Sequence, residues 1–306
     1  MRIDTLTYHN VETQGAHRRA WLREHSPQHL QHCAALIHSA LEKRLSSVSR
    51  GTVVLGAGAC TEIPLEELAR HSDEVVLVDF DMRSPMQARQ ELPLSTLRDR
   101  VNFMNCDLTG DVSLKLYNLL NRQAWRALAS QGPRAVFDFA ATCLEQCPIP
   151  DPPQFEEPRM GGFGLVVSSL ILSQLFSYPL LDILDRVQQF APVYLNEQEY
   201  HHRYQQAAQD FRIRIIQAHL HLMRELLDTG GLAVLLSDIR GFIFHVMNPN
   251  RDAEHLRSIP LVPRAFPELV RDTFTVQQEE QWEWITDLPE KDKFGRGYEV
   301  VGYVLS

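Results

Sequence analysis

The sequence predicts an α/β fold in which a doubly wound, mostly parallel seven-stranded sheet carries helices on both faces and ends in an antiparallel hairpin. Short apolar runs, such as residues 52–55 and 74–79, alternate with segments whose apolar residues recur at helical spacing. Towards the C-terminus, residues 273–286 and 298–305 form two strand-like segments with a polar turn and no helix between them. The alternation predicts the parallel part of the sheet, and the last two segments predict its hairpin.

The composition is that of an ordinary globular protein, with 306 residues of which 44% are hydrophobic and 23% charged. We expect residues 1–50 to form a helical lead-in and residues 51–306 to form one α/β domain with an inserted loop and helical cap at about 143–228. No apolar run reaches the roughly 18 residues that a membrane span needs. The N-terminus also lacks the apolar core of a signal peptide, so we expect a cytoplasmic protein with no membrane association.

The net charge of −9 argues against a nucleic-acid partner, because binding a phosphate backbone requires a basic face. Arginines are scattered along the chain and form no such face in the sequence. A small-molecule or protein substrate is therefore favoured.

The lead-in contains one clear helical pattern between Ser26 and Ser46, which we expect to lie against the sheet. Its histidines, His29, His32 and His38, fall at positions that the pattern makes polar.

A glycine turn follows the first strand, whose apolar residues predict burial on both faces. Gly56 and Gly58 allow a tight turn with exposed backbone, and Thr61 can cap a helix that starts near Pro64. Strand, glycine turn and helix in this order are typical of a nucleotide or dinucleotide site over the carboxyl end of the strand.

The second strand, residues 74–79, ends in Asp79, about 20 residues beyond the turn, where an acidic group would bind a ribose diol. Phe80 follows it directly. An ordinary α/β turn followed by solvated acids is the alternative interpretation.

The turn at residues 56–60 reads Gly-Ala-Gly-Ala-Cys and resembles the Gly-x-Gly-x-Gly first motif of class I S-adenosylmethionine-dependent methyltransferases. Cys60 stands where that motif has its third Gly, and Val54 stands where it usually has an acidic residue. A nicotinamide-binding turn would have Gly in place of Thr61, and dinucleotide-binding domains lack the terminal hairpin. The resemblance covers residues 51–306 and implies a Rossmann-like methyltransferase domain that binds S-adenosylmethionine.

Two further acids match the family by position. Asp107 follows the third strand, residues 101–106, where these methyltransferases place an Asp against the adenine amino group; it could equally cap the next helix. Asp138 lies in residues 135–142, which we predict to be the fourth strand, and the resemblance places it near the transferred methyl unless it is a structural cap. The implied cofactor-binding residues are Gly56, Ala57, Gly58, Asp79, Phe80, Asp107, Leu108 and Asp138.

The pattern breaks after the predicted fourth strand. Residues 147–158 are rich in proline and lead to Gly161–Gly164, which we interpret as a flap with a hinge, or alternatively as a disordered insertion. Residues 165–179 predict a buried element that crosses onto the sheet. Its polar residues, Ser168, Ser169, Ser173 and Gln174, are expected to satisfy backbone or helix contacts.

The longest helical pattern covers residues 196–228, and residues 232–238 predict the fifth strand. Tyr200, His201 and His202, at the start of that helix, are candidates for a catalytic base. A solvated first turn explains the same residues without a function.

Four cysteines follow predicted strands and would face the same edge of the sheet: Cys60, Cys106, Cys143 and Cys147. A zinc or iron–sulfur site is conceivable, but the spacing matches no pair of short Cys motifs. We expect small buried thiols and no metal.

The sequence therefore predicts S-adenosylmethionine-dependent methyl transfer to a small-molecule acceptor. Two alternatives stay open: a non-catalytic or degenerate protein of the same fold that binds the cofactor, and an NAD(P)-dependent oxidoreductase.

Overall fold

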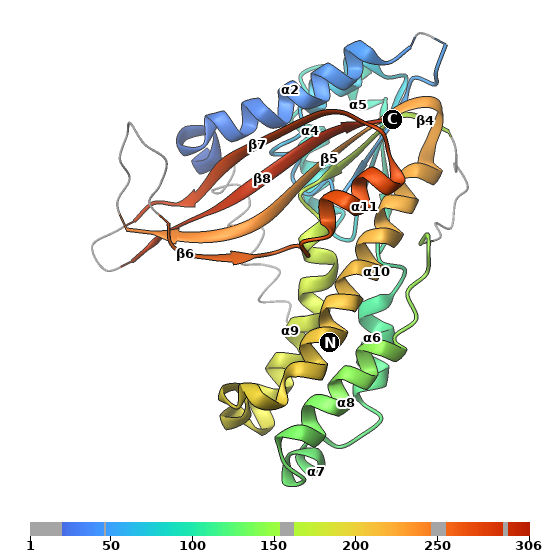
Figure 1. The fold of residues 1–306 in the computed structure, drawn as a ribbon. Helices are drawn as coiled ribbons and strands as arrows, with labels where there is room; N and C mark the ends of the chain where they lie inside the picture. Colours follow the sequence, from blue (N-terminus) through green and yellow to red (C-terminus); the bar gives the residue numbers. More distant parts are fainter. Residues whose placement is uncertain (1–19, 46, 154–161, 246–254, 290–292) are drawn as a thin grey trace.

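The computed structural model describes residues 20–45, 47–153, 162–245, 255–289 and 293–306 (Figure 1). One sheet organises them, and its strands are β1 (Gly51–Leu55), β2 (Glu74–Asp79), β3 (Val101–Asn105), β4 (Phe163–Ser169), β5 (Leu227–Phe244), β6 (His255–Pro260), β7 (Val276–Asp287) and β8 (Gly295–Leu305). The order across the sheet is β3-β2-β1-β4-β5-β8-β7, with β6 paired to β5.

The predicted fold class is confirmed. Strands β1 to β5 pair in parallel, and β8 and β7 add the antiparallel terminal hairpin. The sheet has one strand more than expected: β6 pairs antiparallel with residues 240–244 of β5, beyond the point where β4 ends. This extra strand gives the extended end of β5 a partner on the side that β4 leaves open.

Helices cover both faces of the sheet and bury two hydrophobic clusters (Figure 1). One face carries α2 (Pro27–Lys43), α3 (Leu65–His71), α4 (Arg83–Gln90) and α5 (Ser95–Arg98). The other carries α6 (Val112–Leu120), α7 (Trp125–Ser130), α8 (Pro133–Gln146), α9 (Leu172–Phe190), α10 (His202–Leu226) and α11 (Phe266–Thr273). Within the described residues, no helix combines the length and apolarity that a membrane crossing needs.

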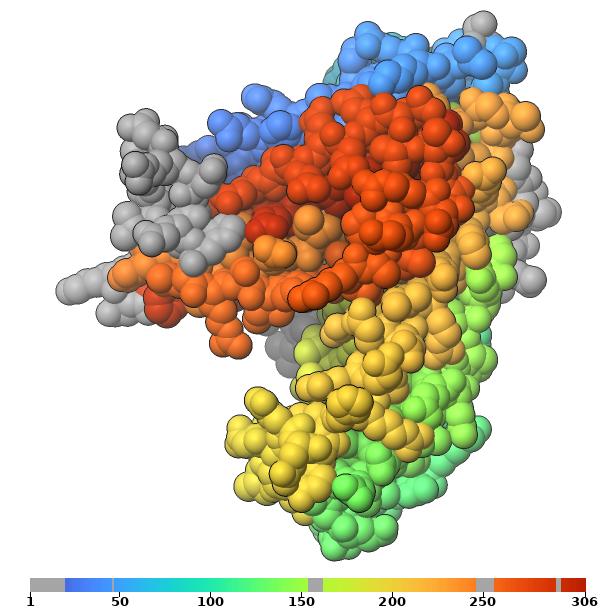
Figure 2. Space-filling model, in the orientation of Figure 1, coloured from blue at the N-terminus to red at the C-terminus, as the bar shows by residue number. Residues whose placement is uncertain are grey.

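The outer parts of α8, α9 and α10 project away from the sheet, together with α7 and the 3₁₀ turns η1 (Pro192–Asn196) and η2 (Gln198–Tyr200) (Figure 1). We call this projection the helical arm. Figure 2 shows that the surface is hollowed between the end of the arm and β6.

The predicted fourth strand, residues 135–142, is wrong, because this segment lies within helix α8. Its apolar residues form an almost unbroken run, which periodicity alone cannot assign to strand or helix. Pro133 occupies the first turn, where its fixed φ suits a helix start. The fourth strand is instead β4, in the segment expected to be a buried element crossing the sheet, and every residue of β4 is buried.

The expected hinge is replaced by strand structure. Gly161 and residues 154–160, which include Pro158 of the predicted flap, lie outside the described residues, whereas Phe163 and Gly164 begin β4. A Cβ atom built on Gly164 would lie 1.8 Å from the backbone oxygen of Ser49. Glycine is therefore needed here because two backbones approach closely, and the contact fixes β4 against the loop that precedes β1.

The helix predicted between Ser26 and Ser46 is present as α2 and packs on β8, β5 and β7. The polar position predicted for His29 is wrong. Its ring is buried, stacks on Trp284 with ring centroids 4.4 Å apart, and accepts a 2.9 Å hydrogen bond from Trp282 Nε1. His38 is exposed and pairs with Glu42 and Glu67. The helical pattern could not predict that His29 is buried, because the residues that bury it, Trp282 and Trp284, are in the C-terminal hairpin.

Replacing Gly164 by alanine should destabilise the fold by about 1–3 kcal/mol, because the added methyl group overlaps a backbone oxygen that cannot rotate away. Gly241→Ala in β5 is the matched control, since its added Cβ would meet its nearest neighbour at 3.6 Å. Urea unfolding of both variants measures the difference. Equal stabilities would contradict the close approach at Gly164.

His29 should make the fold sensitive to acid. Burial, with a smaller contribution from His32, lowers the pKa of His29 to about 3, below the value of about 6.5 in an unfolded chain. The unfolded state therefore binds the proton first, so this contribution to stability is complete above about pH 6.5 and is lost progressively towards pH 3, by at most about 1.4 kcal/mol per pH unit. Burial likewise lowers the pKa of His219 to about 4, so two residues contribute to the slope.

His29→Gln keeps a hydrogen-bond acceptor for Trp282 but cannot titrate. We measure urea unfolding between pH 4.5 and 7, within the range where the unfolded His29 gains a proton and the folded one does not. We expect the unfolding free energy of this variant to change less steeply with pH than that of the unmodified protein. Exposed His71→Gln, in α3, is the control. The same slope in His29→Gln and in the unmodified protein would rule out the role of His29.

Candidate functional site

The glycine turn lies at the carboxyl edge of the parallel strands, directly after β1. The backbone amides of Gly56 and Ala57 donate to the carbonyl of Val78 in β2, at 3.0 and 3.1 Å. Gly56 has a φ of +69°, and a Cβ built on it would lie 2.5 Å from Cβ of Ile171. Gly58 has a φ of +49°, and a Cβ built on it would meet no atom within 4 Å. One glycine thus permits close packing, and the other leaves backbone beside open space.

Asp79 ends β2 and is hydrogen-bonded to this turn. Its Oδ2 accepts from the amide of Gly58 at 2.7 Å, and its Oδ1 accepts from the amide of Asp81 at 2.9 Å. Phe80, the next residue, is 60% exposed. The structure therefore brings Gly56, Gly58, Asp79 and Phe80 together at one edge, as the sequence predicted.

Cys60, which replaces the third glycine, keeps a glycine-like backbone with a φ of +50°. This left-handed conformation costs a residue with a side chain roughly 1–2 kcal/mol. The partly buried Cys60 packs against the cluster beneath α2 and α3. The turn therefore has the backbone conformation that glycine favours, although the sequence departs from the motif.

Asp107 follows β3 at the same edge, where the amide of Cys106 donates to the carbonyl of Asp79 at 3.1 Å. Asp107 Oδ1 accepts from the amide and hydroxyl of Thr109, at 2.8 and 2.6 Å. The Thr109 hydroxyl in turn accepts from the amide of Val112, the first residue of α6, at 3.1 Å. Thr109 therefore binds the first amide of α6, and Asp107 holds Thr109 in place. Leu108, between them, is buried against α6.

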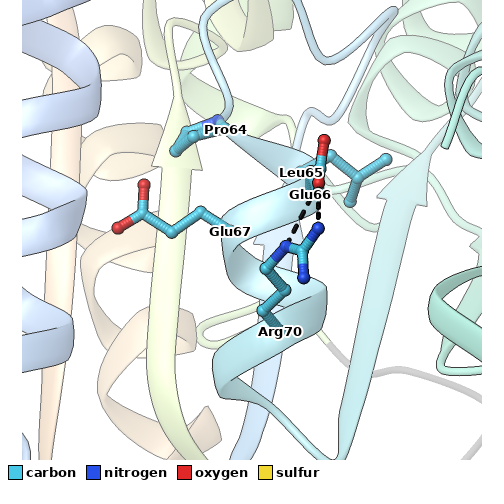
Figure 3. A pocket seen from close by; sticks show the side chains of 5 residues that line it. All are labelled: Pro64, Leu65, Glu66, Glu67 and Arg70. Atoms are coloured by element: carbon cyan, nitrogen blue, oxygen red, sulfur yellow. Dashed lines mark hydrogen bonds and ion pairs between the residues drawn. The ribbon is translucent and has the colours of Figure 1, made fainter. Parts of the chain in front are cut away.

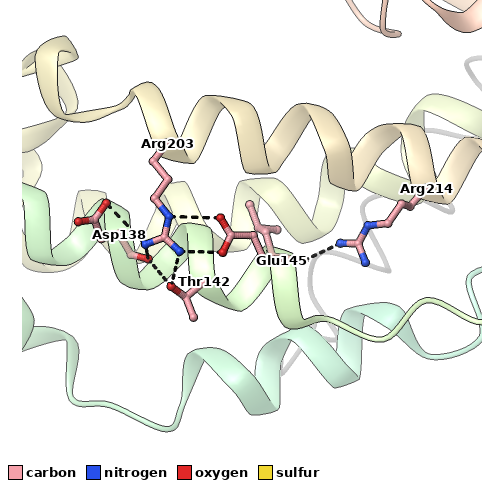
Figure 4. Close-up of polar contacts among 6 residues, drawn as sticks. Asp138, Thr142, Glu145, Arg203 and Arg214 are labelled. Carbon is pink, nitrogen blue, oxygen red and sulfur yellow. Dashed lines mark hydrogen bonds and ion pairs between the residues drawn. The ribbon is translucent and has the colours of Figure 1, made fainter.

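Asp138 does not lie at this edge, which corrects its predicted place at a strand end. It lies in α8 and faces Arg203 of α10, with 3.8 Å between Oδ1 and the nearest guanidinium nitrogen (Figure 4). Arg203 also binds Glu145 at 2.7 Å and the Thr142 hydroxyl at 3.0 Å. Further along α10, Arg214 donates to the carbonyls of Leu144 and Cys147 at the end of α8. These contacts join two helices and explain Asp138 structurally.

Tyr200, His201 and His202 lie where η2 meets α10, in the part of the arm distant from the sheet (Figure 1). His201 Nε2 is 2.9 Å from the carbonyl of Tyr194, and the His201 ring packs on Phe137 with the ring centroids 4.0 Å apart. A hydrogen bond to Glu199, and its charge, raise the pKa of Tyr200. These contacts hold the group within the arm, and its role as a catalytic base stays a prediction.

The cysteines do not share one edge, because Cys143 lies in α8 and Cys147 directly follows that helix. Burial raises the pKa of both thiols to about 11. Cys60 and Cys106 are half-buried at the carboxyl edge. Across the described ranges, no group of three or more His, Cys, Asp or Glu side chains is arranged to hold a metal ion.

An open depression lies elsewhere, on α3, and is lined by Pro64, Leu65, Glu66, Glu67 and Arg70 (Figure 3). Glu66 and Arg70 form an ion pair across it. It includes none of the predicted site residues.

The structure adds two residues that the sequence analysis did not place in the site. Asp238 lies in β5, two residues beyond the point where β4 stops pairing with it. Its Oδ2 accepts a 2.9 Å hydrogen bond from the hydroxyl of Ser173 in the first turn of α9. Burial raises the pKa of Asp238 to about 6. The sequence did contain a signal for Asp238, because this acid ends an apolar run as Asp79 does.

Neither a protein-family model nor a curated protein matches the sequence. Among solved structures, an S-adenosylmethionine-dependent methyltransferase from Mesorhizobium loti is 12% identical with a TM-score of 0.39, over 88% of this chain and 97% of that one. A putative methyltransferase of Haloferax volcanii, in complex with its activator Trm112, is 11% identical with a TM-score of 0.42, over 95% and 94%. The glycopeptide N-methyltransferase MtfA, complexed with S-adenosylmethionine, is 14% identical with a TM-score of 0.37, over 88% and 86%.

The sheet order, the terminal hairpin and the glycine turn of this chain are the features that the sequence analysis expected of this fold. In these features the chain is similar to class I S-adenosylmethionine-dependent methyltransferases.

Proposed function

We propose that this protein transfers the methyl group of S-adenosylmethionine to a small-molecule acceptor. The observation that supports this most is the turn at Gly58, where backbone faces open space beside a carboxylate at the carboxyl edge of the central strands. Ligands of open α/β sheets bind at this edge. The residues present there fit the cofactor: a glycine without a side chain in the way, and acids on two neighbouring strands.

Asp79 is the residue we assign to the ribose diol of the cofactor. Its hydrogen bonds to the amides of Gly58 and Asp81 fix the orientation of the carboxylate. Asp107, on the next strand, is assigned to the adenine amino group, and its bond to Thr109 holds it in place. Gly56, Ala57 and Gly58 supply the backbone over which the cofactor lies, and exposed Phe80 and buried Leu108 flank it.

The cofactor supplies a methyl group that its sulfonium already activates. The protein then has to hold the acceptor in line with this methyl and to exclude water. The net charge of −9 favours a small acceptor over a nucleic acid.

Asp79→Asn should weaken binding of S-adenosylmethionine about 10- to 100-fold, because a carboxylate accepts two ribose hydroxyl hydrogen bonds and an amide accepts fewer. Asp73→Asn is the matched control: Asp73 directly precedes the same strand at its opposite end and makes an exposed ion pair with Arg50. Calorimetric titration with S-adenosylmethionine and with its demethylated product measures both variants.

Absence of binding to either ligand, in a folded protein, would refute the proposal. Binding of a nicotinamide dinucleotide in their place would favour the oxidoreductase alternative. Binding of S-adenosylmethionine without release of the demethylated product, across amine, hydroxyl and thiol acceptors, would favour the non-catalytic alternative.

A further inference from the structure

Asp238 places a carboxylate beyond the end of β4, a strand that itself ends in Ser168 and Ser169 and carries no acid. The Ser168 hydroxyl is already hydrogen-bonded, since it lies 2.9 Å from Nε2 of buried His219. The nearest acid provided by the neighbouring strand is therefore Asp238, which its bond to Ser173 draws towards the start of α9.

A continuous set of contacts connects Asp238 with the glycine turn. The chain leaves β4 through Leu170, whose amide donates to the carbonyl of Leu236 in β5 and whose φ is +51°. Ile171 then packs against Gly56, and Ser173 binds Asp238. Left-handed backbone at a residue with a branched side chain is costly and occurs preferentially at ligand sites. The carboxylate and the proposed cofactor site thus lie on the two sides of one strained turn.

One carboxylate oxygen of Asp238 receives no hydrogen bond from another residue. Oδ2 is bound by Ser173, whereas Oδ1 is enclosed by protein and has no partner elsewhere within the described part of the chain. A buried carboxylate oxygen in this state is unfavourable unless a proton or a donor reaches it. The bond from Ser173 comes from a neutral hydroxyl, so the negative charge on the carboxylate is not neutralised by that partner.

We propose that Asp238 accepts the proton of the methyl acceptor, so that the reacting atom of the acceptor is an amine nitrogen or a hydroxyl oxygen that carries hydrogen. This inference rests on the proposed function. The lone pair of the acceptor forms the new bond to the methyl carbon, and the carbon–sulfur bond breaks with its electron pair left on sulfur. Because Asp238 as a whole is half-buried, a rotation of its side chain exposes Oδ1 to the acceptor, whose proton passes to Oδ1 and from there to water.

Ser173 is the positioning residue for this step. Its hydroxyl donates a hydrogen bond to Oδ2, so Oδ1 is the oxygen that can accept one from the methyl acceptor. Burial raises the pKa of Asp238 to about 6, so the carboxylate is a stronger base than an exposed aspartate and is still mostly ionised at neutral pH.

The test follows the side-chain carboxyl carbon of Asp238 by NMR as pH is varied, in full-length protein saturated with the demethylated cofactor product. The amine probe is benzylamine, with toluene as its control that lacks a donor. The hydroxyl probe is phenol, with anisole as its control. A donor bound to Oδ1 stabilises the ionised form, so the titration midpoint should fall by about one pH unit or more.

Asp238→Asn should bind the effective probe at least about tenfold more weakly, since a charged hydrogen bond is replaced by a neutral one. Asp228→Asn is the matched control, because Asp228 is also a hydrogen-bonded acid of β5 but lies at the opposite edge of the sheet. Ser173→Ala should keep the probe bound and move the Asp238 midpoint upward.

A shift with benzylamine alone assigns an amine acceptor, a shift with phenol alone assigns a hydroxyl acceptor, and a shift with both supports either. The inference is overturned if neither donor moves the midpoint, or if toluene and anisole move it equally. Calorimetry first measures binding of the demethylated product. If the product binds but neither donor moves the midpoint, only this inference fails. If the product does not bind, the proposed function fails as well.

Discussion

Strand β4 is the element on which the other parts of the site depend. It is buried along its whole length and pairs in parallel with β1 on one side and β5 on the other. At its start, Gly164 meets the backbone of Ser49; at its end, the chain brings Ile171 against Gly56 and Ser173 against Asp238. The glycine turn and the enclosed carboxylate are therefore held at a fixed separation by one strand, and a change in its register would displace both.

Three carboxylates lie at the edge that this strand organises, and the hydrogen bonds that hold them come from neutral groups. Backbone amides bind Asp79, Thr109 binds Asp107, and Ser173 binds Asp238. These donors orient the acids without cancelling their charge. An edge of this kind favours a ligand with positive charge or with many hydrogen-bond donors. The sulfonium, ribose hydroxyls and adenine amino group of the proposed cofactor provide both properties.

The parts of the site that the sequence predicted are those fixed by local chemistry. Gly56, Gly58 and Asp79 belong to a strand–turn–helix–strand unit whose spacing sets their geometry. Asp138 was misplaced because an apolar run without glycine or proline inside it suits strand and helix equally. Tyr200 to His202 stay candidates only, because the residue pattern of α10 gives its length but not the direction in which it projects. Asp238 was missed because its bond to Ser173 joins residues 65 apart in sequence, which no local pattern reports.

The contact between His29 and Trp282 joins residues that are 253 positions apart. Helix α2 is synthesised before β7 and β8, which cover much of its apolar face. During synthesis the buried residues of α2, including Leu36 and Ile37, have no completed sheet to pack against. Helix α2 therefore keeps an unprotected apolar face until β7 and β8 have been made, a period in which association with other molecules competes with folding.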